Sequence, residues 1–274
     1  TLFLLTNLSF ASYSTVTMNV VEEPVCTIEL GENSKFEKKL ISKDLNNKEV
    51  TIQLQVKNDE VVNKPTGEIM LVLDNSDSMN NTVDGTKTRK ELIFDSAKTL
   101  VSNLLKDNEE LKIGIVSFST NTDISKEGSS EDANLVSSLS NDISKLNNAI
   151  SNIKADGPRT NLESGLDLAS GQFTKTDNNK YMIVLTDGVP NVALNYDKNY
   201  YSDDVISKTK SKLQQLKQSN INVITMLTGI DDEKYIPATT TKSFGEIIEE
   251  IFGTTSNPTV GKFYYVTDNE VESI

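Results

Sequence analysis

Four runs of apolar residues constrain the fold of this chain more than any other feature. They cover residues 69–73, 113–116, 182–185 and 223–227. Strands that are apolar throughout are buried on both faces, which is typical of parallel sheets covered by helices. Apolar residues at three-to-four spacing predict helices over residues 92–105 and 205–216. We therefore expect an α/β fold with a doubly wound, mainly parallel sheet flanked by helices, which binds ligands beyond the carboxyl ends of its strands.

A different pattern precedes these runs. Apolar and polar residues alternate over residues 14–62, with the apolar positions at Val16, Met18, Val20, Cys26, Ile28, Leu30, Val50, Ile52, Leu54 and Val56. A period of two predicts strands that are buried on one face, as in an antiparallel sheet, with a turn at Asn46-Asn47. We expect residues 12–65 to form a β-rich segment that belongs to a β-sandwich, and residues 66–274 to form the α/β domain.

The N-terminus carries a short apolar run over residues 2–10, followed by Ala11. The small residues Ser9 and Ala11 resemble the cleavage site of a secretory signal peptide, which predicts a partial signal peptide over residues 1–11 and an exported protein. The run is too short to span a bilayer. A buried strand is the alternative interpretation.

Composition narrows the chemistry that is available. The 274 residues include 27 Lys and Arg against 40 Asp and Glu, a net charge of −13, and they include no His. The acidic balance argues against nucleic acid as a partner. The absence of His removes imidazole bases, His-assisted nucleophiles and His-ligated zinc. Carboxylate, hydroxyl and amide oxygens remain, and these oxygens favour Mg²⁺ or Ca²⁺.

Oxygen-bearing side chains follow the apolar runs at the expected sheet edge. Asp74, Ser76 and Ser78 follow the first run, Thr160 precedes a helical pattern, and Asp187 follows the third run. Taken singly, Asp74 or Ser76 could cap the next segment, Thr160 with Glu163 could form a capping box, and Thr186-Asp187-Gly188 could be a turn. Their joint occurrence favours a metal site.

The sequence does not match two other motifs that begin with an aspartate, the EF-hand loop and the aspartyl phosphatase motif. An EF-hand loop that begins at Asp74 would need Gly at its sixth position and Glu at its twelfth, where this chain has Met79 and Gly85. An aspartyl phosphatase would want a second Asp at residue 76, where this chain has Ser.

The five residues resemble the signature of the von Willebrand factor type A domain with a metal-ion-dependent adhesion site. That signature is Asp-x-Ser-x-Ser with a Thr and an Asp on two further loops, and the resemblance extends from about residue 67 to the end. It implies that Ser76, Ser78 and Thr160 contact Mg²⁺, or Mn²⁺, directly. It also implies that Asp74 and Asp187 act mostly through bound water, and that an open coordination position accepts a carboxylate from a partner.

Three details qualify the resemblance. Asp77 stands where Gly is frequent, and it either raises tolerance for Ca²⁺ or faces solvent. Arg159 precedes Thr160 where small residues are usual. Residues 230–261 are long for a loop, contain a helical pattern over 244–252, and are expected to be an insertion near the binding face. A strand over 262–266 and a final helix that is cut short, beginning near Thr267, complete the expected domain.

The resemblance suggests a function but does not fix it. We expect an exported bacterial surface or pilus-type protein, not an enzyme, that binds a protein or extracellular-matrix ligand and adjoins pilus or cell-wall subunits. One alternative is an intracellular module of a metal-inserting or ATP-driven assembly. A metal-dependent hydrolase is the other alternative, which the lack of any base except Asp and Glu disfavours.

Overall fold

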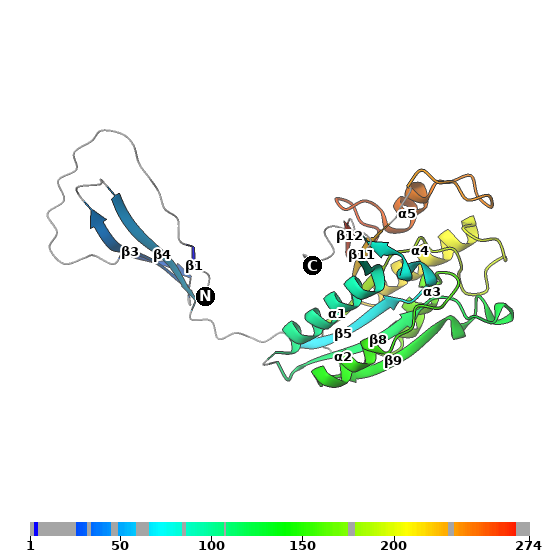
Figure 1. The fold of residues 1–274 in the computed structure, drawn as a ribbon, viewed down its shortest axis with the longest axis horizontal. Helices are drawn as coiled ribbons and strands as arrows, with labels where there is room; N and C mark the ends of the chain where they lie inside the picture. Colours follow the sequence, from blue (N-terminus) through cyan, green and yellow to red (C-terminus); the bar gives the residue numbers. More distant parts are fainter. Residues whose placement is uncertain are drawn as a thin grey trace. The chain divides into compact units, whose positions relative to one another are not determined.

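The structure is a computed structural model that describes residues 3–4, 26–31, 34–44, 49–58, 66–83, 86–106, 108–174, 179–229 and 233–266. The chain divides into two compact units, Thr1–Lys64 and Pro65–Ile274. Each unit is described by itself (Figure 1). The predicted helix that begins near Thr267 lies outside the described residues.

The first unit contains one antiparallel sheet of four strands in the order β1-β4-β3-β2. Its strands are β1 (Phe3–Leu4), β2 (Cys26–Gly31), β3 (Ser34–Asp44) and β4 (Glu49–Asn58). β2 and β4 coincide with two of the strands that the alternating pattern predicts, whereas β3 was not predicted. The expected strand around Val16–Val20 and the turn at Asn46-Asn47 lie outside the described residues.

Two residues of the apolar N-terminal run form a strand. Phe3 and Leu4 make up β1, which pairs antiparallel with Gln55 and Leu54 of β4. A strand is the alternative that the sequence left open for residues 2–10. The signal peptide over residues 1–11 stays a prediction.

The second unit is built around a six-stranded sheet in the order β12-β11-β10-β5-β8-β9. The strands are β5 (Gly67–Asp74), β8 (Leu111–Phe118), β9 (Ala133–Ser140), β10 (Asn179–Thr186), β11 (Ile221–Thr228) and β12 (Lys262–Val266). All neighbouring pairs are parallel except β8 and β9, which are antiparallel. The predicted fold class, a mainly parallel α/β sheet preceded by an antiparallel β segment, is confirmed.

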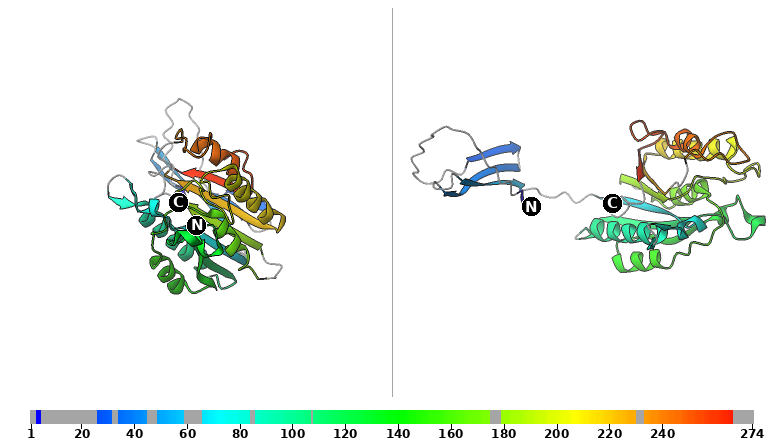
Figure 2. Two further views of the ribbon diagram at one scale, coloured as in Figure 1. Left: turned by 90° about the vertical axis from the view of Figure 1, so that its right-hand side faces the viewer. Right: turned by 45° about the horizontal axis from the view of Figure 1, so that its top comes forward.

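Helices cover both faces of this sheet (Figure 2). One core contains residues of α1 (Arg89–Leu105) and α2 (Ile143–Ser151), together with Ile69, Leu71 and Leu73 of β5. The other core contains residues of α3 (Leu162–Ser170), α4 (Asp203–Gln218) and α5 (Phe244–Phe252), together with Met70 and Val72. Alternate residues of β5 therefore point into opposite cores, which is why its sequence is apolar throughout.

Short elements fill the connections. They are the 3-10 helices η1 (Asp77–Asn80), η2 (Ile124–Lys126) and η3 (Ser130–Asp132), and the paired strands β6 (Thr82–Val83) and β7 (Lys87–Thr88). Among the helices in the described part of the chain, none has the length and apolar character that a membrane crossing requires.

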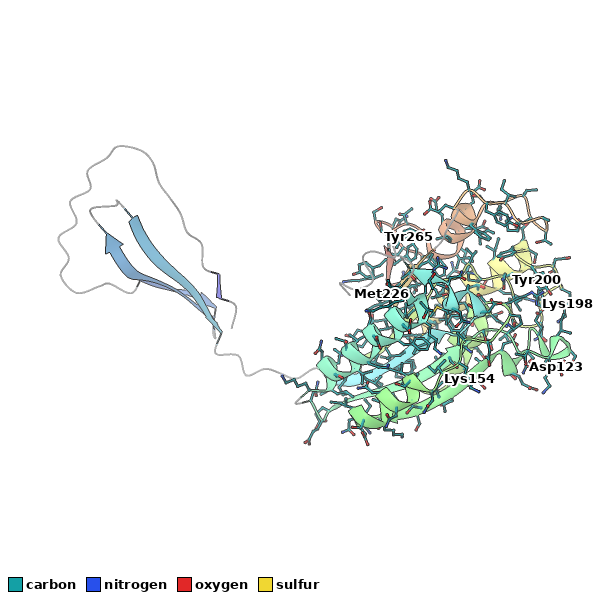
Figure 3. All side chains as sticks on the ribbon, viewed as in Figure 1. Asp123, Lys154, Lys198, Tyr200, Met226 and Tyr265 are labelled. Atoms are coloured by element: carbon teal, nitrogen blue, oxygen red, sulfur yellow. The ribbon has the colours of Figure 1, made fainter. Side chains whose placement is uncertain are left out.

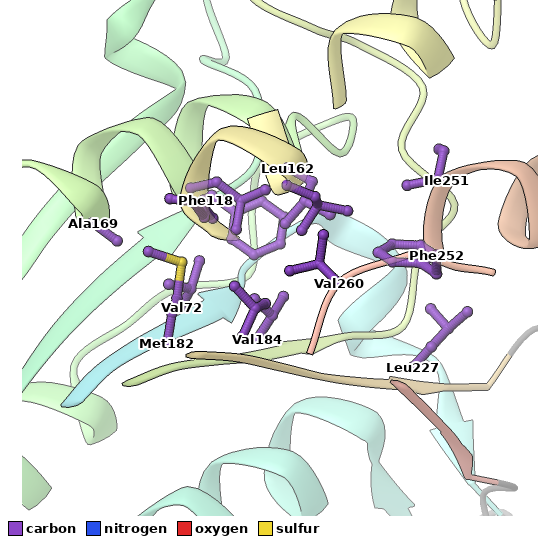
Figure 4. Packing of buried hydrophobic residues seen from close by; sticks show 14 of the residues in the cluster. Val72, Phe118, Leu162, Ala169, Met182, Val184, Leu227, Ile251, Phe252 and Val260 are labelled. Carbon is purple, nitrogen blue, oxygen red and sulfur yellow. The ribbon is translucent and has the colours of Figure 1, made fainter. Parts of the chain in front are cut away.

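Helix α3 packs closely on the sheet through Gly165. A Cβ added there would lie 2.8 Å from both Cβ and Cγ of Phe118, whose side chain is fully buried (Figure 4). Ala gains about 1 kcal/mol of helix propensity over Gly, but overpacking a rigid core costs about 1–3 kcal/mol. We therefore expect Gly165→Ala to lower the free energy of unfolding by about 1 kcal/mol.

Urea unfolding of the purified chain measures this difference. The matched control is Gly171→Ala at the end of the same helix, where φ is −75° and the added Cβ would meet only Leu168 O at 3.6 Å. That variant should unfold no more easily than wild type. Equal stability of the Gly165 and Gly171 variants would show that α3 can shift away from Phe118 without loss.

Candidate metal centre

Two loops meet at the carboxyl end of β5. The loop that leaves β5 contains Asn75, Ser76 and Asp77, and it runs beside Gly157 in the loop that leads to α3. The amide of Asp77 donates to Gly157 O at 2.7 Å, and the amide of Gly157 donates to Asn75 O at 3.3 Å. Backbone hydrogen bonds thus hold the loop before Thr160 against the one that carries the two serines.

Four of the five candidate residues are linked by short contacts. The hydroxyls of Ser76 and Ser78 lie 3.0 Å apart, and the hydroxyl of Ser78 donates to Asp187 Oδ1 at 2.9 Å. The amide of Ser76 donates to Asp74 Oδ1 at 2.8 Å. Ser76, Ser78 and Asp187 line an open pocket of about 470 Å³, although Ser76 and Asp187 are almost fully buried, and Asp74 is fully buried.

Thr160 faces the same space from the other side. A Cβ added to Gly188 would lie 2.7 Å from Thr160 Oγ1 and 3.5 Å from Asp74 Oδ2. Asn191 fixes the Thr160 backbone through two hydrogen bonds. The amide of Thr160 donates to Asn191 Oδ1 at 2.9 Å, and the carbonyl of Thr160 accepts from the amide of Asn191 at 3.1 Å. The structure thus brings all five predicted residues together, around a space that only a glycine at position 188 leaves open.

The two carboxylates lie in an environment that disfavours their charge. Burial raises the pKa of Asp74, although hydrogen bonds from Ser76 and Thr186 oppose the shift. Burial, and then the charge of Asp74, raises the pKa of Asp187 to about 7. Arg89 lies 3.4 Å from Asp187 Oδ2 and offsets part of this effect. A cation in the pocket would favour the ionised form of both carboxylates.

Chemically, the donor set fits a hard cation. Hydroxyl and carboxylate oxygens suit Mg²⁺, Mn²⁺ or Ca²⁺, and they suit soft metals poorly. Within the described ranges there is no group of three or more His, Cys, Asp and Glu side chains that could hold a metal. The candidate cluster is of a different kind, because three of its five members are hydroxyl residues.

Local capping occupies only one of these side chains, because Asp74 Oδ1 accepts from the amide of Ser76. The N-cap of α3 is Asn161, whose side chain accepts from Ser164 N, and not Thr160. The carboxylate of Glu163 instead accepts from the amide of Leu194 at 2.8 Å. The capping-box interpretation of Thr160 and Glu163 is therefore wrong. Ser76 precedes η1 but makes no side-chain capping hydrogen bond.

Three neighbours of the candidate ligands were not predicted. Arg89, from the first turn of α1, reaches Asp187, and Asn191 holds Thr160. The hydroxyl of Thr186 donates to Asp74 Oδ2. Thr186 was visible as part of the Thr186-Asp187-Gly188 turn, but nothing in the sequence marked Arg89 or Asn191.

Two departures from the signature also have defined positions. Asp77 is exposed at the rim of the pocket. Arg159 pairs with the buried carboxylate of Glu127 at 2.9 Å, and its guanidinium lies 4.1 Å from the ring centre of Tyr200. Tyr200 and Lys198 belong to the loop that follows β10 (Figure 3).

The long segment before β12 contributes to the pocket. Its predicted helix is α5, and Tyr235 and Phe244 line the pocket together with Tyr201. The expected position of this segment near the binding face agrees with the pocket lining.

Fold and pocket together place the second unit among the open α/β proteins that bind a ligand at the carboxyl ends of their strands, and here the pocket is lined by oxygen-bearing side chains. Residues 69–189 match the family model of the von Willebrand factor type A domain. This match confirms the resemblance that the motif indicated, and it spans all five candidate residues. No curated protein sequence matches the chain.

Solved structures of pilus proteins share this fold. The pilus adhesin SpaC from Lactobacillus rhamnosus GG is 18% identical with a TM-score of 0.61, over 90% of this chain and 34% of SpaC. The von Willebrand factor domain of the type V pili tip protein Mfa5 from Porphyromonas gingivalis is 13% identical with a TM-score of 0.55, over 77% of this chain and 92% of the Mfa5 domain. The PilB minor pilin from Streptococcus sanguinis is 13% identical with a TM-score of 0.54, over 92% of this chain and 75% of PilB.

These identities establish similarity of fold alone. The chain spans about a third of the length of SpaC. The activity and partners of the whole protein are therefore taken up as proposals.

Proposed function

We propose that this chain binds a protein or matrix ligand at the bacterial surface through a divalent cation, and that it is a binding protein rather than an enzyme. The observation that carries the proposal is the meeting of three hydroxyls and the Asp187 carboxylate in one open pocket, with the buried carboxylate of Asp74 beside them. The similar folds of pilus adhesins and pilins support a surface role. The signal-like N-terminus supports export.

Each residue has a defined part in this proposal. Ser76, Ser78 and Thr160 would hold Mg²⁺ directly, with Mn²⁺ or Ca²⁺ as substitutes, while Asp74 and Asp187 orient its waters. When bound, the cation supplies a strongly electrophilic centre that can take a carboxylate from the ligand. Arg89 and Asn191 keep Asp187 and Thr160 in place. We also propose the division into a β-rich segment over residues 12–65 and the type A domain over 66–274.

A random-peptide display library tests the proposal. Peptides retained by the immobilised chain in Mg²⁺ should be released by a chelator, and they should contain Asp or Glu. Thr160→Val keeps the side-chain shape and removes the hydroxyl, so it should lower the affinity for the recovered peptides by about tenfold.

The matched control is Thr160→Ser, which retains the hydroxyl and should bind as wild type does. Peptides that stay bound in excess chelator, or that lack acidic residues, would contradict the proposal.

A further inference from the structure

Three aromatic side chains form a second wall of the pocket that contains the candidate metal-binding residues. We call Tyr201, Tyr235 and Phe244 the aromatic wall; all three line the pocket. The rings of Tyr201 and Phe244 lie 5.4 Å apart with a tilt of 42°, and those of Tyr235 and Phe244 lie 5.1 Å apart with a tilt of 57°. Tyr235 is 52% exposed and Tyr201 and Phe244 are half-buried, so the wall presents an aromatic surface to solvent in the same pocket as the candidate metal-binding residues.

The wall is held in position by backbone contacts. The amide of Phe244 donates to Tyr235 O, and the amide of Gly245 donates to Glu233 O, each at 2.9 Å. Tyr201 has a φ of 57°, a left-handed conformation that costs an aromatic residue about 1–3 kcal/mol. Strain of this kind is concentrated at ligand-binding positions, because the surrounding structure must enforce it.

Asn191 connects the wall to the candidate cation ligands. Its side-chain carbonyl accepts from the amide of Thr160 at 2.9 Å, while its side-chain amide donates to the hydroxyl of Tyr201 at 3.2 Å. The amide of Tyr201 donates to Asn191 O at 3.2 Å. One residue thus sets the positions of Thr160 and Tyr201 together, so the oxygen-lined and aromatic parts of the pocket form one preorganised surface.

We propose that the aromatic wall is a second subsite, which binds the ring of an aromatic or proline residue that lies beside the acidic residue of a protein ligand. The inference rests on the proposed function, because the acidic residue is the group that the cation would take. Aromatic rings pack against one another edge-to-face or offset, so a ring of the ligand can pack against the exposed ring of Tyr235.

The peptides recovered from the display library test the inference. With wild type, Phe, Tyr, Trp or Pro should be enriched within about two positions of the acidic residue. Replacing that ring by Gly in a recovered peptide should weaken binding about fivefold. With Tyr235→Ala, acidic residues should still be selected, but the ring preference and the fivefold difference should both be lost.

Ile236→Ala is the matched control. Ile236 is the next residue, is 55% exposed and does not line the pocket, so its variant should behave as wild type does. Acidic peptides without ring enrichment would overturn the inference and leave the proposed function standing. Absence of chelator-released peptides would overturn both. N-acetylneuraminic acid serves as a sugar probe: if Tyr235→Ala abolished its binding but left peptide affinity unchanged, the wall would serve an acidic sugar and the inference would be wrong.

Discussion

Asp74→Asn should reduce the affinity for Mg²⁺ by about 100-fold without unfolding the domain. The amide keeps the shape of the carboxylate and an oxygen that can accept from Ser76 N, but it removes the charge that would orient the waters of a cation. Burial raises the pKa of Asp74, so the ionised carboxylate is less favourable in the folded chain than in the unfolded chain. Removing that charge should therefore not destabilise the metal-free protein.

Calorimetric titration with MgCl₂ and thermal unfolding measure the two effects separately. At about 100 times the Kd of wild type, Mg²⁺ should stabilise wild type by about 2.7 kcal/mol and the variant by about 0.4 kcal/mol. Asp77→Asn is the control, because Asp77 lies in the same loop but is exposed. An Asp74→Asn protein that binds Mg²⁺ as tightly as wild type would exclude Asp74 from the site.

The fold was predictable where burial leaves a strong pattern. The central strands are apolar on both faces, so the runs at 69–73, 113–116, 182–185 and 223–227 located β5, β8, β10 and β11. β9 escaped prediction because it is an edge strand whose residues are mostly half-buried or exposed. In the described part of the chain β9 pairs with β8 alone, and this antiparallel pairing has two register shifts, so the sequence of β9 shows no regular alternation.

The candidate site was predictable to the extent that its residues share short motifs. Asp74, Ser76 and Ser78 lie within one loop, and Thr160 and Asp187 each adjoin a predicted element. Arg89 reaches Asp187 across 98 positions, and Asn191 reaches Thr160 across 31. Such pairs arise only when the chain folds, and an isolated Arg or Asn in the sequence carries no sign of its partner.

Gly188 should be as important for the cation as any of its ligands. The residue has no positive φ, so Ala is compatible with the backbone there. Its Cβ, however, would lie 2.7 Å from Thr160 Oγ1 and 3.5 Å from Asp74 Oδ2. Because 2.7 Å is closer than a carbon and an oxygen can approach, the Thr160 hydroxyl would have to move. We expect Gly188→Ala to weaken Mg²⁺ binding by about 100-fold.

The free energy of unfolding in the absence of metal separates loss of the site from loss of the fold. It should change by less than about 1 kcal/mol, since the group that must move is the Thr160 side chain in the wall of the pocket rather than a side chain in the packed core. Gly171→Ala, which also adds one methyl group to a glycine, should bind Mg²⁺ as wild type does. Unchanged Mg²⁺ affinity in Gly188→Ala would mean that the space between Thr160 and Asp74 is not where a cation binds, even if Asp74→Asn abolished binding. Loss of affinity in both variants, with both still folded, would assign the cation to that space.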